Sequence, residues 1–312
     1  MNKVEHLIVS NSFDYTSDYI AIELEKREAS YIRINYDQLH EIKYAYSIDD
    51  GLNIAFDKDE KFFLAKDGIK SVFFRAPVFI RSNKAYSLET QLRRSQASAF
   101  IRNLIVFEKA KWINHPVSIY KAENKMYQLE IAHKCGLKIP TTYIGNYCLN
   151  NIDENKMYAV KSLDTALFFD GKQEYFTYTT IMPGLELMKA SLADAPLIVQ
   201  DCIEDKIDIR VTYIAGKVFP AAITNKGEKI EGDWRKTPKQ NLMYSSCVLP
   251  QGLIEALVKL MEDLGLSFGG IDLAFSKGDY YFIEVNPTGE WGWLLKTAGF
   301  PIAETIVDFM QT

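Results

Sequence analysis

The order of hydrophobic and polar positions indicates different architectures in the two parts of the chain. Near the N-terminus, an apolar run at His6–Ser10 is followed by helical spacing over Asp18–Lys26 and by a second apolar run at Tyr31–Asn35. This order predicts a β-α-β unit, which brings two parallel strands together. Ser71–Pro77 predicts a further strand that the proline ends. We therefore expect a parallel α/β lobe over residues 1–115.

Strand-like runs separated by turn residues dominate the rest of the chain. Asp49–Gly51, Gly216 and Lys277–Asp279 are predicted hairpin turns. The predicted strands cover residues 157–163, 175–180, 197–203, 209–215, 217–225, 271–276 and 280–285. The predicted helices cover residues 88–111, 119–133 (ending at Cys135-Gly136), 253–264 and 302–310. Strands joined by hairpins predict an antiparallel sheet, so we expect an α/β plus α+β protein with further parts at 116–200 and 201–312.

Composition and charge narrow the class of protein. The 312 residues include 36 Lys and Arg and 41 Asp and Glu, a formal net charge of −5, so nucleic acid is not an expected partner because duplex binding relies on a basic excess. No apolar run approaches the ~20 residues of a membrane-spanning helix, so we expect no membrane partner. The four cysteines have no CxxC spacing, which argues against a zinc site or a disulfide framework and predicts a cytoplasmic protein.

The densest group of candidate site residues lies on two predicted strands joined by a short turn. Glu284 and Asn286 are two positions apart, so their side chains leave the same face of one strand, and Asp272 lies on the preceding strand. Two carboxylates and an amide oxygen suit Mg²⁺ that bridges nucleotide phosphates. The alternative is a solvated sheet face with scattered acids. Tyr280–Val285 is mostly apolar, however, and buried carboxylates are costly without a cation.

The set of Asp272 and Glu284–Pro287 resembles the metal-binding signature of the ATP-grasp superfamily of carboxylate ligases. The resemblance covers roughly residue 122 to the C-terminus and implies the ATP-grasp fold, with ATP and Mg²⁺ as cofactors. It implies that Lys125 and Lys161 contact the ATP phosphates. Taken alone, Lys125 is better explained as an ordinary solvated helix lysine, whereas Lys161 interrupts an apolar strand. The further positions that the resemblance marks as nucleotide-binding are Gln200, Asp201, Cys202, Ile203 and Asp208.

A narrower resemblance connects the chain with the peptide macrocyclases that make microviridins and related graspetides. It rests on Asp233–Arg235, Glu284–Trp291, Ser10–Thr16 and Phe73–Pro77. This resemblance implies an ATP-dependent ligase that activates Asp or Glu side chains of a ribosomally made precursor peptide as acyl phosphates. Condensation with Ser, Thr or Lys side chains would then form ester or amide macrocycles. The implied partners are a precursor with leader and core segments, and a second copy of the chain in a homodimer.

The implied chemistry gives the remaining charged residues an expected role. Arg210 and Arg235, together with Lys161, are the expected catalytic groups, because planar guanidinium forks suit the paired oxygens of a phosphoryl group. Arg75, Asp233 and Glu290 are the expected substrate contacts. Arg75 follows an apolar strand, so a surface arginine at a strand end is the alternative.

One departure from the ATP-grasp pattern concerns the loop over the phosphates, and two other functions stay open. The glycine-rich loop of many ATP-grasp enzymes corresponds here to residues 164–175, which contain a single glycine, so a hairpin turning at Asp170-Gly171 is the candidate lid. An intermolecular ligase that adds an amino acid to a protein tail or small molecule would use the same ATP and metal residues. A binding module of the same shape without turnover is the third alternative.

Overall fold

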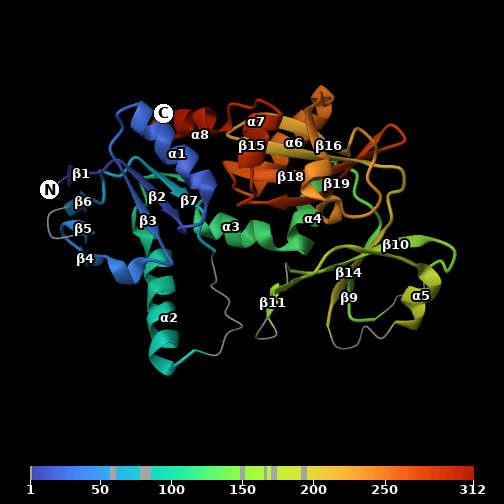
Figure 1. The fold of residues 1–312 in the computed structure, drawn as a ribbon, viewed down its shortest axis with the longest axis horizontal. Coiled ribbons are helices and arrows are strands. Elements are labelled where there is room, and N and C mark those ends of the chain that lie inside the picture. The colour runs from blue at the N-terminus through green and yellow to red at the C-terminus, as the bar shows by residue number, and fades with distance from the viewer. Residues whose placement is uncertain are drawn as a thin grey trace.

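The computed structural model describes residues 2–56, 61–77, 86–147, 152–164, 167–169, 174–190 and 195–312. Within these ranges, no helix is both long enough and apolar enough to cross a membrane. Figure 1 shows the N-terminal sheets on the left, the C-terminal sheet at the upper right and the smaller central sheet at the lower right.

A parallel sheet forms the centre of the N-terminal lobe. Its strand order is β3-β2-β7-β8, and every neighbouring pair is parallel, which confirms the predicted β-α-β start. The strands are β2 (His6–Ser10), β3 (Tyr31–Asn35), β7 (Ser71–Phe74) and β8 (Lys111–Ile113), and helix α1 (Tyr15–Lys26) connects the first two. Every residue of β2 and β7 is buried, which explains their continuous apolar runs.

A second sheet, with the order β1-β6-β5-β4, lies at the outer edge of this lobe. Its strands are β1 (Asn2–Lys3), β4 (Lys43–Ser47), β5 (Gly51–Ala55) and β6 (Lys61–Leu64), and the predicted hairpin joins β4 to β5. The predicted helix over residues 88–111 is too long, because α2 (Leu88–Asn103) gives way to a 3₁₀ turn and then to β8. Leu104 and Phe107 are buried in the core of the lobe, so packing ends the helix there.

Two helices replace the single helix predicted over residues 119–133. α3 (Pro116–Glu123) has proline at its first position, and α4 (Lys125–Lys134) begins after a break at Asn124, whose backbone is extended. The Asn124 side chain donates to the carbonyl of Tyr120 at 2.6 Å, so it competes with the backbone bonds that would continue α3. Gly136, with a φ of 77°, follows the end of α4 as predicted.

The central sheet is antiparallel and has the order β13-β10-β14-β9. Its strands are β9 (Thr142–Gly145), β10 (Met157–Ser162), β13 (Thr180–Pro183) and β14 (Leu197–Asp201), and α5 (Gly184–Lys189) follows β13. A separate hairpin consists of β11 (Leu167–Phe169) and β12 (Glu174–Phe176). The strand predicted over residues 175–180 is therefore divided between β12 and β13.

A five-stranded antiparallel sheet with the order β17-β16-β15-β18-β19 forms the C-terminal part. Its strands are β15 (Ile207–Ile214), β16 (Lys217–Asn225), β17 (Leu242–Ser246), β18 (Phe268–Ser276) and β19 (Asp279–Asn286), and α6 (Gln251–Asp263) covers one face. The predicted turn glycines Gly216 and Gly278 have positive φ values of 91° and 88°. The β18–β19 register shifts by one residue between Asp272 and Leu273, so Ile283 is an extra residue of β19.

The last two helices, α7 (Gly292–Thr297) and α8 (Ile302–Gln311), complete the core of the N-terminal sheet. Ile306 and Trp291 are buried in the same cluster as Phe73 of β7. α8 also lies on α1, where Arg27 forms a 2.8 Å ion pair with Asp308. The α/β plus α+β class is thus confirmed, while the boundaries at residues 115 and 200 stay predictions.

Candidate active site

One cavity collects nearly all of the predicted site residues. Its volume is about 830 Å³, and its walls come from the central sheet, the C-terminal sheet, the segment that follows β19 and, in the N-terminal lobe, Tyr36, Pro77 and Arg94. Every predicted site residue except Arg75 lines this cavity.

Strand pairing in the C-terminal sheet places three charged side chains in one row. Arg210 of β15 lies opposite Asp272 of β18, which lies opposite Glu284 of β19. Opposite residues on antiparallel strands share one face of the sheet. The Arg210 guanidinium donates to Asp272 at 2.8 Å and occupies space left by two glycines, since a Cβ at Gly270 would lie 2.6 Å from Arg210 Nε and one at Gly289 would also overlap the guanidinium.

Asn286 and Lys125 complete the group around the two carboxylates. The Asn286 amide nitrogen lies 3.2 Å from an oxygen of Asp272 and 3.2 Å from an oxygen of Glu284. Lys125, the first residue of α4, donates to Glu284 Oε2 at 2.7 Å. A lysine at a helix N-terminus is disfavoured by the helix dipole, so the carboxylate that it faces accounts for its place there.

The two carboxylates have opposite pKa shifts. Burial raises the pKa of Asp272, and the Arg210 guanidinium only partly offsets that rise. Burial acts on Glu284 in the same direction, but the Lys125 and Lys161 ammonium groups outweigh it and lower the pKa of Glu284 to about 2. Glu284 is therefore anionic at neutral pH and supplies a fixed negative charge to the cavity.

The residues fit a divalent metal ion by their chemistry. Asp272 and Glu284 offer carboxylate oxygens, and Asn286 would add its amide oxygen once the amide, whose nitrogen faces both carboxylates, turns over. Cationic side chains already lie against both carboxylates. Across the described parts of the chain, no group of three or more His, Cys, Asp and Glu residues forms a metal site. An ion at this place would need water or substrate oxygens to complete its shell, which is the usual arrangement for Mg²⁺ with nucleotide phosphates.

The second predicted lysine belongs to the central sheet. Lys161 of β10 donates to Gln200 Oε1 of β14 at 2.7 Å, and Gln200 donates to Thr142 at 2.9 Å. Burial lowers the pKa of Lys161, although nearby Glu284 opposes the shift. Asp201–Ile203 continue along the cavity wall from the end of β14. The structure thus brings both predicted lysines and the predicted nucleotide-binding strand to one cavity.

Asp233 and Arg235 form a compact pair beside the carboxylate row. Arg235 donates to the two oxygens of Asp233 at 2.8 Å and 2.7 Å, and the Thr179 amide donates to Asp233 at 3.2 Å. These hydrogen bonds with Asp233 raise the pKa of Arg235, and the charges of Glu284 and Asp272 add to the rise. Arg235 is therefore a permanent cation in the cavity, and Asp233 connects it with the central sheet.

Two further predictions concern the edge of the cavity. Asp208 lines the wall, is paired with Lys206, and has a pKa raised by burial. The predicted lid corresponds to the β11–β12 hairpin, but its turn at Asp170-Gly171 lies outside the described residues.

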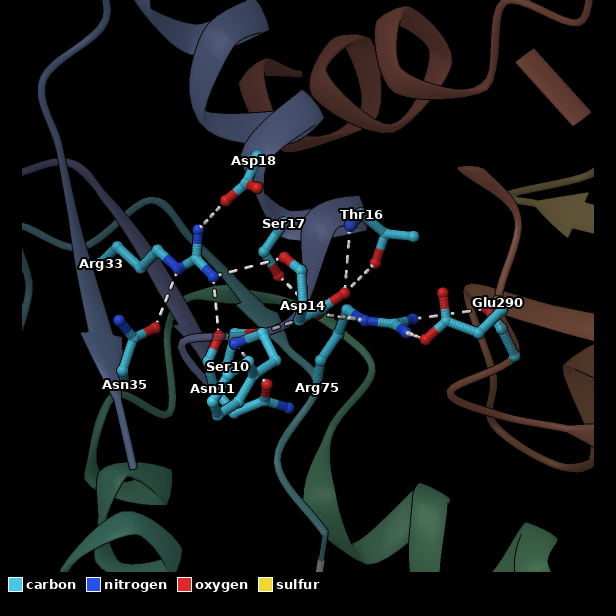
Figure 2. Close-up of polar contacts among 12 residues, drawn as sticks. Ser10, Asn11, Asp14, Thr16, Ser17, Asp18, Arg33, Asn35, Arg75 and Glu290 are labelled. Atoms are coloured by element: carbon cyan, nitrogen blue, oxygen red, sulfur yellow. Dashed lines mark hydrogen bonds and ion pairs between the residues drawn. The ribbon is translucent and has the colours of Figure 1, made fainter. Parts of the chain in front are cut away.

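Arg75 differs from the other predicted residues because it does not line the cavity. Figure 2 shows its guanidinium between Asp14 and Glu290, with Nε 2.7 Å from Asp14 and a terminal nitrogen 3.0 Å from Glu290. The Arg75 side chain is only 6% exposed, so it is not a surface arginine at a strand end, and its role as a substrate contact stays a prediction. Glu290 itself lines the cavity.

The sequence analysis missed several residues that position the site. Gln128 of α4 accepts from the Val285 amide at 2.9 Å and donates to the Val285 carbonyl at 2.7 Å, which fixes the strand between Glu284 and Asn286. A polar residue within an amphipathic helix gives no sequence signal for such a contact. Gly270 could have been recognised from the sequence, because two consecutive glycines weaken a strand and nothing in the neighbouring sequence, such as a turn, requires them there.

Comparisons with known proteins find relatives of part of the sequence and of the whole fold. Residues 180–310 match the family described as the RimK-like ATP-grasp domain. A probable alpha-L-glutamate ligase of Haemophilus influenzae (strain PittEE) is 22% identical over 205 residues, which are 64% of this chain and 67% of the relative. A probable alpha-L-glutamate ligase of Mannheimia succiniciproducens is 24% identical over 205 residues, with the same coverage.

Solved structures match almost the whole chain. A Chryseobacterium gregarium RiPP-associated ATP-grasp ligase, in complex with ADP and a leader and core peptide, superposes with a TM-score of 0.83 at 23% identity, covering 100% of this chain and 97% of that one. Macrocyclase MdnC of Microcystis aeruginosa MRC, bound with precursor peptide MdnA, gives 0.81 at 23% identity, with 98% and 99% covered. Macrocyclase MdnB of the same organism gives 0.74 at 26% identity, also with 98% and 99% covered. The chain therefore has the ATP-grasp fold and is an ATP-dependent ligase, and its residues 180–310 are similar to the RimK-like ATP-grasp domain.

Proposed function

We propose that this ligase activates Asp or Glu side chains of a ribosomally made precursor peptide as acyl phosphates and condenses them with Ser, Thr or Lys side chains into ester or amide macrocycles. The observation that carries the proposal is the single cavity in which an acidic row, two lysines and two arginines meet. This set suits the joint binding of a triphosphate and a carboxylate, whose like charges must be brought together for phosphoryl transfer.

In this proposal, Asp272, Glu284 and Asn286 hold Mg²⁺, which when bound neutralises charge on the nucleotide phosphates. Lys125 and Lys161 bind the remaining phosphate oxygens, and the wall formed by residues 200–203 binds the adenine. Lys125 already faces a carboxylate of the metal set, so one ammonium can serve both the protein and the nucleotide.

Arg210 and Arg235 are the proposed contacts of the transferring phosphoryl group and the acyl phosphate. Both guanidinium groups are already held by carboxylates, so their positions are fixed before substrate binds. Removing one such contact costs about a hundredfold in rate in comparable sites. Asp233 and Glu290 are the proposed peptide contacts within the cavity.

A peptide partner follows from the proposed chemistry and is supported by relatives of the same fold that were solved with leader, core or precursor peptides. We propose that this chain likewise recognises a precursor with a leader and a core, acts as a homodimer and works in the cytoplasm.

The mass of the peptide tests the proposal. The enzyme is incubated with ATP, Mg²⁺ and the short peptides encoded beside its gene, and each crosslink should lower the peptide mass by ~18 Da, the loss of one water. Omission of ATP is the control. An unchanged peptide mass together with ATP consumption on other acceptors would overturn it.

The second candidate is an intermolecular ligase that adds an amino acid to a protein tail or a small molecule. The curated relatives named as probable alpha-L-glutamate ligases favour it. This reaction shares every nucleotide and metal residue but raises the mass of the acceptor, so the same mass measurement separates the two candidates.

A further inference from the structure

A buried polar network connects the N-terminal lobe with the segment that follows the metal strand. Asp14, the N-cap of α1, accepts hydrogen bonds from the hydroxyl groups of Ser10 and Ser17, each at 2.7 Å. Arg75 leaves the end of β7, binds Asp14, and continues to the Gly289 carbonyl at 3.4 Å and to Glu290 at 3.0 Å. Figure 2 shows Arg75 as the bridge between the two lobes.

Arg33 is a second arginine of the same network and can be compared with Arg75. It contacts Asp18, the backbone carbonyls of Asn11 and Asp14, and the side chain of Asn35. Figure 2 shows that it lies on the opposite side of Asp14 from Glu290. Arg33 thus supports the same turn as Arg75 without a contact that leads to the cavity.

Glu290 has a different environment from the other acids of the cavity. The side chains of Asp272, Glu284 and Asp233 are 21%, 22% and 3% exposed, and each faces a cation that also lines the cavity. The Glu290 side chain is 53% exposed, and its cation, Arg75, approaches from outside the cavity. One side of Glu290 is therefore held by the protein, while the carboxylate remains accessible from the cavity.

We propose that Glu290 accepts the proton that the attacking hydroxyl or neutral amine group loses, and that Arg75 is the positioning residue that holds Glu290; this inference rests on the proposed function. As the nucleophile oxygen or nitrogen bonds to the acyl carbon, the bond from that carbon to the phosphate oxygen breaks. The nucleophile's proton passes to Glu290 and then to the departing phosphate, so the carboxylate is regenerated. Gly289, next to Glu290, packs against Arg210, which brings the carboxylate close to the proposed phosphoryl contact.

The charges around Glu290 suit a proton acceptor. Burial raises the pKa of Glu290 and the Asp14 charge adds to the rise, whereas Arg75, Arg210 and a hydrogen bond from Tyr15 lower it. A raised pKa makes a carboxylate a stronger base. Loss of the Arg75 cation would raise the pKa of Glu290 further.

Trapping the acyl phosphate separates this step from activation. Hydroxylamine is a nucleophile that is already unprotonated at neutral pH, and it converts an acyl phosphate to a hydroxamate without a protein base. At saturating peptide, where a weaker peptide contact no longer limits the rate, we expect Glu290→Gln to form hydroxamate on the peptide at nearly the parent rate but to slow ring closure by about 10²-fold or more. Equal loss of both reactions, or unchanged ring closure, would overturn the role of Glu290. A parent enzyme that forms neither product would instead refute the proposed function.

The positioning role of Arg75 has its own readout. Arg75→Gln should slow ring closure and move the acidic limb of its pH–rate profile to higher pH, and Arg75→Lys should restore part of both. Arg33→Gln is the matched control, which should leave the ratio of ring closure to hydroxamate formation and the acidic limb unchanged. A loss in Arg75→Gln that is uniform across pH, or the same loss in Arg33→Gln, would show a merely structural role and contradict the inference.

Discussion

Substitution of Gly270 by alanine tests the packing of the central arginine. A Cβ at this position would lie 2.6 Å from Arg210 Nε, and its backbone φ is not positive, so the methyl group meets the guanidinium without straining the backbone. Carbon and nitrogen atoms need ~3.5 Å or more, so the guanidinium must move by about 1 Å. The 2.8 Å bond with Asp272 cannot survive that movement unchanged.

Two effects should follow from the displacement. Overpacking of a filled interior costs about 1–3 kcal/mol of unfolding free energy. A misplacement of about 1 Å in a catalytic contact costs about a hundredfold in rate. We therefore expect Gly270→Ala to remain folded, with a lower midpoint in urea and with ADP release reduced by about two orders of magnitude.

Gly252→Ala is the matched control because the same methyl group meets nothing within 4 Å in the helix α6. Alanine is favoured over glycine in a helix by up to about 1 kcal/mol, so this variant should be slightly more stable and fully active. Normal turnover and stability of Gly270→Ala would refute the view that the glycine makes room for Arg210.

Three other perturbations probe the charges of the site and the network. Glu284→Gln and Asp272→Asn should abolish ADP release while the circular dichroism spectrum stays native, and near-normal turnover of either variant would contradict the metal assignment. Removal of divalent ions with a chelator should stop ATP consumption, and added Mg²⁺ should restore it. Turnover that persists without Mg²⁺ would contradict a metal site at Asp272, Glu284 and Asn286. Burial opposes ionisation of Asp14, but Arg75 and nearby hydroxyls hold its pKa well below the ordinary 3.8, so it stabilises the fold at neutral pH and loses that contribution as the pH falls below 3.8. The urea midpoint of Asp14→Asn should therefore change less with pH in this range than that of the parent. Equal slopes of the midpoint against pH would exclude a contribution of Asp14 ionisation to stability.

The sequence predicted the carboxylate set because its geometry depends on local rules. Alternation along a strand puts Glu284 and Asn286 on one face, and a tight hairpin at Lys277–Asp279 returns the chain so that Asp272 lies opposite Glu284. The parallel start of the fold follows from similar local signals at His6–Ser10 and Tyr31–Asn35.

Features that depend on distant contacts were outside the reach of the sequence. The helix predicted to Lys111 ends early because Leu104 and Phe107 enter a core built from other strands. Arg75 looked like a surface residue or a substrate contact because its partners, Asp14 and Glu290, are 61 and 215 positions away. Pairings of this kind become visible only when the lobes are assembled.

The extra residue Ile283 divides the β18–β19 ribbon into two halves that tolerate insertions and deletions differently. On the hairpin side of Ile283, a longer turn between β18 and β19 would leave Asp272 and Glu284 in place, because the strand pairs on that side have a register of their own. Loss of Ile283 would only make the ladder regular, with Glu284 still opposite Asp272, whereas deleting Val285 would turn Asn286 onto the reverse side of the ribbon, against α6. The length of the segment from Glu284 to Asn286 is thus a requirement for activity, even though Val285 between them carries no reactive group.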